Sequence, residues 1–238
     1  MKRLSIILIA LLSCGSVWAQ SSYYHDYKSF FGKEDRLALF SDEAKILYSD
    51  NIRQDIIANT LLVDCGSKEK PATGFIANFE DGQRIVTAAH NVQMASDNSR
   101  PCIIKRQDKP DALIHDFKPS QDFKNSATLL DTGFDIAVSN TKLPSNGFNI
   151  CKSFNLNSDL VVAQSYDGKG YLTLSPSCHA TKITKHMITT TCRGHYKASG
   201  APLLAIQDDT ICVAGVFNAH SGSLMEYEGY AARMRASD

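Results

Sequence analysis

The chain has 238 residues, with 25 basic and 25 acidic side chains and 43% hydrophobic residues. This composition excludes a disordered or fibrous protein, and the length suits one large domain or two small ones. The neutral charge balance gives no support for a nucleic-acid or anionic-membrane partner, because both normally require a basic surface. No stretch beyond the N-terminal segment is long enough to anchor the chain in a membrane, so we expect no stable membrane insertion.

The N-terminus predicts a secretory signal peptide. Met1-Lys2-Arg3 supplies a charged start, and residues 4–12 form an apolar run that is too short to span a bilayer. We expect cleavage after Ala19, which removes two basic and no acidic residues and leaves 23 basic against 25 acidic side chains. A second interpretation takes residues 11–14 as a lipoprotein site with Cys14 acylated. We expect an exported protein, located in the periplasm or secreted.

Export changes the expected role of the cysteines. Six remain without Cys14, namely Cys65, Cys102, Cys151, Cys178, Cys192 and Cys212. In an oxidising compartment they can form three disulfides, for which fifteen pairings are possible. The alternative is a zinc site built from Cys178, Cys192 and the nearby His179, His186 and His195, but the spacing contains no Cys-x-x-Cys and fits no compact zinc site. We expect no metal and no cofactor.

The remaining chain predicts mainly short strands. Residues 20–50 form an N-terminal extension with a helical stretch from Ser41 to Tyr48, capped by Ser41. Beyond it, apolar runs rich in Val, Ile, Thr and Phe alternate with turn residues, including tight hairpins at residues 80–83 and 207–210. The predicted strands are Ile56 to Val63, Gly74 to Phe79, Arg84 to Ala88, Cys102 to Lys105, Asp135 to Val138, Leu160 to Gln164, Tyr171 to Leu174, Met187 to Thr191, Ala201 to Ile206, Ile211 to Phe217 and Tyr230 to Met234. This pattern predicts an all-β sandwich or barrel.

A linker is expected at residues 142–147, where Pro, Ser, Asn and Gly cluster after a predicted strand. The expected organisation is therefore a signal peptide at 1–19, the extension at 20–50, a first half at 51–147 and a second half at 148–238.

Three segments carry side chains that could act together in catalysis. They are Thr-Ala-Ala-His ending at His90, Asp-Ile-Ala-Val starting at Asp135, and Ser-Gly-Ala-Pro starting at Ser199. Each has an ordinary explanation alone: a structural histidine, a turn aspartate and a loop serine. Together they are more informative, because a hydroxyl nucleophile needs a base to take its proton and a carboxylate to orient that base.

These segments resemble the trypsin-like, or chymotrypsin-fold, serine peptidases, especially their exported bacterial branch. The order His90, Asp135, Ser199 also matches that family, and the resemblance extends from about Ile56 to Met234. It implies two six-stranded antiparallel β-barrels, with His90 and Asp135 from the first, Ser199 from the second, and the active site at their junction. The implied activity is that of a serine endopeptidase on a protein or peptide substrate, and we expect a monomer.

The resemblance also implies roles for individual residues. His90 would be the general base, Asp135 its orienting carboxylate and Ser199 the nucleophile, while the backbone N–H groups of Lys197 and Ser199 would form the oxyanion hole. The nucleophile loop departs from the family at two positions. Lys197 replaces the usual glycine, and Ala198 replaces the acidic residue that trypsin-type zymogens pair with a new N-terminus. These departures motivate an alternative function, a protease-like binding module that has lost turnover.

A substrate pocket is the least specific part of the resemblance. Arg193 stands where the family places the pocket floor, and His220 follows the strand that precedes the pocket wall. An inward Arg193 would favour Glu or Asp at the cleaved position, whereas an exposed loop arginine would not.

The same framework implies the disulfide pairs Cys65–Cys102, Cys151–Cys212 and Cys178–Cys192.

Overall fold

The computed structural model describes residues 37–66, 71–93, 100–107, 109–124, 132–165, 172–175, 177–194, 197–207, 209–221 and 228–235. The expected signal peptide, Cys14 and residues 20–36 of the expected extension lie outside these ranges. The helices are α2 (Asp42–Leu47), α3 (Asp50–Asn59) and α4 (Ala89–Gln93). The strands are β1 (Leu37–Ala38), β2 (Thr60–Asp64), β3 (Ala72–Phe79), β4 (Gly82–Thr87), β5 (Cys102–Lys105), β6 (Ala112–Ile114), β7 (Lys118–Pro119), β8 (Ala137–Ser139), β9 (Phe148–Ile150), β10 (Asp159–Ser165), β11 (Leu172–Leu174), β12 (Ala180–Ile183), β13 (Met187–Thr190), β14 (Ala201–Gln207), β15 (Thr210–Ser221) and β16 (Glu228–Arg233).

Two capped helices precede the first long strand. The Ser41 side chain accepts a hydrogen bond at the start of α2, and Ser49 does the same for α3. The predicted strand from residue 56 is wrong in its first half, because those residues end α3 and β2 begins only at Thr60. The physical reason is the Ser49 cap together with Ile52 and Ile56, which are four residues apart and share the buried face of the helix.

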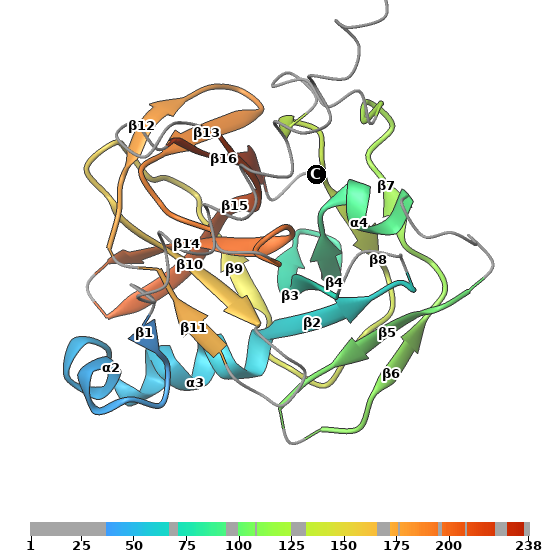
Figure 1. Ribbon diagram of the computed structural model, residues 1–238, viewed down its shortest axis with the longest axis horizontal. Helices are drawn as coiled ribbons and strands as arrows, with labels where there is room; N and C mark the ends of the chain where they lie inside the picture. The colour runs from blue at the N-terminus through green and yellow to red at the C-terminus, as the bar shows by residue number, and fades with distance from the viewer. Residues whose placement is uncertain are drawn as a thin grey trace, which may run out of the picture. The chain divides into compact units, whose positions relative to one another are not determined.

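The strands form two groups that occupy different regions of Figure 1. In the first group the order of paired strands is β6, β5, β2, β3, β4, β8 and β7. In the second it is β1, β11, β10, β14, β15, β16, β13 and β12. All pairings within each group are antiparallel. The largest cluster of buried side chains contains Phe75 and Val86 from the first group and Val161 and Val216 from the second.

The short strand β9 connects the two groups, and its pairing is parallel, which was not predicted. It pairs with β3 on one side and with β15 on the other. The expected linker before it is tied to the first group by side chains. Asn59 Oδ1 accepts from the Gly147 N–H at 2.9 Å, Asn78 Nδ2 donates to Asn146 O at 2.7 Å, and Gln83 Nε2 donates to a carbonyl in the same segment.

A partly buried carboxylate forms a hydrogen-bond network at the end of β8. Asp116 accepts hydrogen bonds from the side chain of Ser139, from the Asn140 N–H at 3.1 Å and from the Thr141 hydroxyl at 3.0 Å. Burial alone would raise the pKa of Asp116, but these hydrogen bonds favour the ionised form and hold the pKa below its ordinary value.

The described residues contain three disulfides, which are the pairs that the family resemblance implied. Cys65–Cys102 joins the end of β2 to the start of β5, and Cys151–Cys212 joins the residue after β9 to β15. The Cys178–Cys192 bond closes the β12–β13 hairpin. Because Cys178 and Cys192 are bonded to each other, neither can supply a thiolate to the alternative zinc site.

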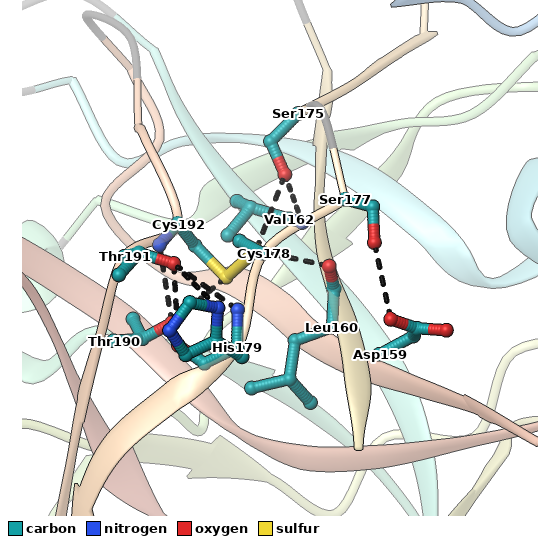
Figure 2. Close-up of a disulfide and its surroundings, with 10 residues drawn as sticks. All are labelled: Asp159, Leu160, Val162, Ser175, Ser177, Cys178, His179, Thr190, Thr191 and Cys192. Atoms are coloured by element: carbon teal, nitrogen blue, oxygen red, sulfur yellow. Dashed lines mark hydrogen bonds between the residues drawn. A yellow bond between two sulfur atoms is a disulfide. The ribbon is translucent and has the colours of Figure 1, made fainter. Parts of the chain in front are cut away.

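Figure 2 shows the surroundings of the Cys178–Cys192 disulfide. Thr190 is fully buried, and its hydroxyl donates to the His179 carbonyl at 2.8 Å and accepts from the Cys192 N–H at 3.1 Å. These bonds give the buried Thr190 hydroxyl an acceptor for its proton and a donor to its oxygen, as a buried polar group requires.

Within the described ranges, none of the helices has the length and apolar character that a membrane crossing requires.

Candidate active site

His90 and Asp135 are in direct contact although 45 residues separate them in sequence. His90 lies in α4, one turn of helix that follows β4, and Asp135 lies two residues before β8. Because β4 and β8 are paired, both residues emerge at the same end of the first group. His90 Nδ1 is 2.5 Å from Asp135 Oδ2, and the backbone N–H of His90 donates to Asp135 Oδ1 at 2.9 Å.

This geometry decides which nitrogen of His90 carries the proton in the neutral ring. The Asp135 carboxylate is an acceptor only when it is ionised, so Nδ1 must be the donor and Nε2 the free acceptor. The Asp135 side chain is only 8% exposed, whereas the His90 side chain is 21% exposed. The imidazole is therefore oriented from its buried side and can accept a proton on its other nitrogen.

Ser199 lies in a tight turn that leads into β14. The Ala201 N–H donates to the Ala198 carbonyl at 2.8 Å, which places Ser199 and Gly200 at the two central positions. Gly200 has a φ of +84°, as the third residue of a type II turn requires. A Cβ at Gly200 would stand 2.2 Å from Thr73 O, so this position excludes every other residue. Glycine after Ser199 therefore allows the turn to pack against β3, because glycine has no Cβ.

The Ser199 hydroxyl donates to the Asn218 carbonyl at 3.2 Å. Among the described residues, no hydrogen bond joins it to His90, and Asn218 provides one of the links between Ser199 and the His90–Asp135 pair. The Asn218 side-chain amide donates to the Asp135 carbonyl at 3.0 Å. Asn218 is thus in contact with Asp135, which contacts the His90 ring, and with the Ser199 hydroxyl.

Lys197 adopts a backbone conformation that is unusual for a residue with a side chain. Its φ is +77°, in the left-handed region that glycine enters at no steric cost. Lys197 therefore adopts a positive φ although it is not a glycine. The next residue, Ala198, is 3% exposed and packs in the core of the second group.

Arg193 and His220 are the two residues expected to form the substrate pocket, and no contact in the described part of the chain joins them. Arg193 directly follows Cys192 and is exposed. The backbone of His220 pairs with Gly229, but its side chain lies outside the described residues. Gly194 is next to Arg193 and lies against the ring of Phe217, because a Cβ at Gly194 would stand 2.2 Å from Phe217 Cε1.

Three residues around this site were not assigned a role from the sequence. They are Thr73, Asn91 and Asn218. Asn91 directly follows His90, which is the one local signal that could have identified it. Thr73 and Asn218 lie within strands and give no local signal, because their roles depend on contacts between distant segments. In the described part of the chain, no group of three or more His, Cys, Asp or Glu side chains could hold a metal ion.

The chain is similar to solved structures of serine proteases. The inactive form of the Rv3671c protease from M. tuberculosis has a TM-score of 0.52 at 18% identity, over 79% of this chain and 89% of that one. The serine endoprotease from Yersinia pestis has a TM-score of 0.55 at 15% identity, over 76% and 60% of the two chains. A Sesbania mosaic virus structure described for its VPg protein has a TM-score of 0.54 at 14% identity, over 76% and 92%.

No protein-family profile matches the sequence, and no curated protein is significantly similar to it. The likeness at these low identities shows the fold. The chain has the chymotrypsin-like, mainly β fold of the trypsin-like serine proteases, as the sequence motifs predicted.

Proposed function

We propose that this protein is an exported serine endopeptidase that hydrolyses peptide bonds through an acyl-enzyme on Ser199. The observation that carries the proposal is the double contact between His90 and Asp135, 2.5 Å at Nδ1 and 2.9 Å at the backbone N–H. It fixes an imidazole with its acceptor nitrogen turned away from a buried carboxylate, and Ser199 is joined to the same carboxylate residue through Asn218.

In the proposed reaction His90 is the general base. The Ser199 hydroxyl rotates from the Asn218 carbonyl to His90 Nε2, and its proton passes to the imidazole as Oγ attacks the carbonyl carbon of the substrate. The Asp135 carboxylate stabilises the imidazolium that forms. His90 then protonates the leaving amine, the peptide C–N bond breaks, and water hydrolyses the acyl-enzyme by the same steps with water as nucleophile.

The oxyanion that forms during the attack would be stabilised by the backbone N–H groups of Lys197 and Ser199. Donors of this kind typically contribute about 10²- to 10³-fold to the rate, because they are already oriented when charge develops. The left-handed φ of Lys197 supports this assignment, since it gives the loop a conformation for which the family uses glycine.

The substrate would be a protein or peptide outside the cytoplasm. The three disulfides are cross-links of the kind that form and persist in oxidising compartments. In our proposal the segment 1–19 directs export and is removed after Ala19. N-terminal sequencing of the protein recovered from the periplasm or medium should then find Gln20 first, whereas an acylated Cys14 at the N-terminus would show the lipoprotein alternative.

Labelling with a fluorophosphonate probe tests the proposed nucleophile. The mature protein should be labelled on Ser199, and Ser199→Ala should not be labelled although it remains folded. His90→Ala should lower the labelling rate by orders of magnitude, because the hydroxyl then has no base. A folded wild type that is not labelled would contradict the proposal.

The alternative is a binding module with the protease fold and no turnover. It is favoured by the Ser199 hydroxyl, which bonds to Asn218 O in this structure. A folded, unlabelled protein that still binds unfolded polypeptide chains would support this alternative.

A further inference from the structure

Thr73 and Asn91 place two first-group side chains against the turn that holds Ser199. Thr73 comes from β3, and Asn91 from α4, the same short helix that carries His90. Their contacts span 124 and 108 residues of sequence, respectively. We infer that Thr73 and Asn91 are positioning residues that hold the nucleophile loop in register with His90, an inference that rests on the proposed function.

The Thr73 hydroxyl binds the backbone of Lys197. It donates to the Lys197 carbonyl at 2.8 Å and accepts from the Ser165 N–H in β10 at 3.3 Å. Thr73 is completely buried, so water cannot replace either bond. Rotation of the Lys197–Ala198 peptide would break the first bond and leave the buried Thr73 hydroxyl without this acceptor. Thr73 therefore fixes the orientation of the Lys197–Ala198 peptide, which leads from Lys197, at a φ of +77°, into the turn that holds Ser199.

Thr73 and Asn91 also hold Ser199 by its backbone. The Ser199 carbonyl accepts from the Thr73 N–H at 3.1 Å and from Asn91 Nδ2 at 3.2 Å. Asn91 Nδ2 is in addition 3.2 Å from Thr87 Oγ1, and that hydroxyl donates to the Thr73 carbonyl at 2.8 Å. The resulting ring of hydrogen bonds joins β3, β4, α4 and the nucleophile loop.

The connection through Asn91 bears directly on the reaction. Asn91 is the neighbour of His90 in sequence, so the bond from Asn91 to the Ser199 carbonyl sets the position of the nucleophile relative to the base. Misplacement of reacting groups by about 1 Å can cost on the order of 10²-fold in rate. The hydrogen bonds of Thr73 and Asn91 thus tie the loop to the first group at the carbonyl oxygens of Lys197 and Ser199, on both sides of Ala198.

Thr73→Val tests the inference, because valine keeps the shape of threonine and removes the hydroxyl. The measurement is the second-order rate of labelling by the fluorophosphonate probe, together with thermal unfolding. We expect Thr73→Val to be labelled about 10- to 100-fold more slowly than wild type. Thr73→Ser, which retains the hydroxyl, should be labelled at a rate within about threefold of wild type.

Thr190→Val is the matched control. Thr190 is also fully buried, and its hydroxyl also donates to a backbone carbonyl at 2.8 Å, but it lies beside the Cys178–Cys192 disulfide (Figure 2). This variant should lose stability as Thr73→Val does and keep the labelling rate of wild type. An equal loss of labelling in both variants would show a general effect of destabilisation and overturn the inference.

Asn91→Leu provides a second test through a residue that is only partly buried. It should fold and be labelled about 10-fold or more slowly than wild type. Wild-type labelling rates in folded Thr73→Val or Asn91→Leu would overturn the inference and leave the proposed function intact. A wild type that is not labelled contradicts the proposed function itself, so the two failures are distinguishable.

Discussion

Replacement of Lys197 by glycine should stabilise the protein, because Lys197 is held at a φ of +77°. A residue with a Cβ in the left-handed region costs about 1–2 kcal/mol, since the Cβ approaches the following carbonyl oxygen. Glycine has no such cost but loses about 0.5–1 kcal/mol more conformational free energy on folding. The expected net gain is about 0.5–1 kcal/mol in the free energy of unfolding.

Thermal unfolding followed by far-UV circular dichroism measures this gain. For a chain of this size, 1 kcal/mol shifts the Tm by roughly 2–4 °C, so Lys197→Gly should raise the Tm by about 1–4 °C. Lys197→Ala is the control, because it removes the same side-chain contacts but keeps the Cβ and its steric cost. A Tm for Lys197→Gly that is equal to or below that of Lys197→Ala would refute the argument from the left-handed conformation.

Three further predictions concern stability. Replacement of both Cys178 and Cys192 by serine should lower the free energy of unfolding by about 3 kcal/mol, the value expected for a short closed loop, in urea titrations; no change would show that the hairpin is not constrained by this bond. Gly200→Ala should prevent the native turn, because its Cβ would stand 2.2 Å from Thr73 O; soluble, wild-type-like protein in a purification would contradict this geometry. The pKa of Asp116 is lowered in the folded state, so its contribution to stability is present above pH 4 and is lost as the pH falls further. In urea titrations between pH 2 and pH 6, the free energy of unfolding of Asp116→Asn should fall less with decreasing pH than that of the wild type. The same pH dependence in both proteins would contradict this contribution of Asp116.

The parts of the site that could be predicted from sequence are those encoded in short segments. His90, Asp135 and Ser199 each stand in a motif of four residues, and the fold follows from many short strands combined with those motifs. Ser41 could likewise be assigned as a cap from its neighbours alone.

The rest depends on contacts between distant segments. The strand predicted to begin at Ile56 is wrong over residues 56–59, because the isoleucines of α3 fit a helical face as well as a strand. The Ser49 cap is the signal that distinguishes the two structures. The hydrogen bond from Thr73 to Lys197 spans 124 residues, and no local pattern encodes such a contact. The same holds for the parallel pairing of β9, because a strand of three residues carries too little pattern to show its partners.

The position of β9 between β3 and β15 also affects how the chain comes apart. A free tether between two halves would let each half unfold alone and would leave an exposed stretch for proteases to cut. Here the segment 142–147 is bound to the first group by Asn59 and Asn78. It continues into β9, which pairs with strands of both groups. Unfolding of either group would remove the strand that pairs with β9 on that side. The two halves should therefore melt in one cooperative transition, and the expected boundary at residues 142–147 should resist limited proteolysis until the whole chain opens.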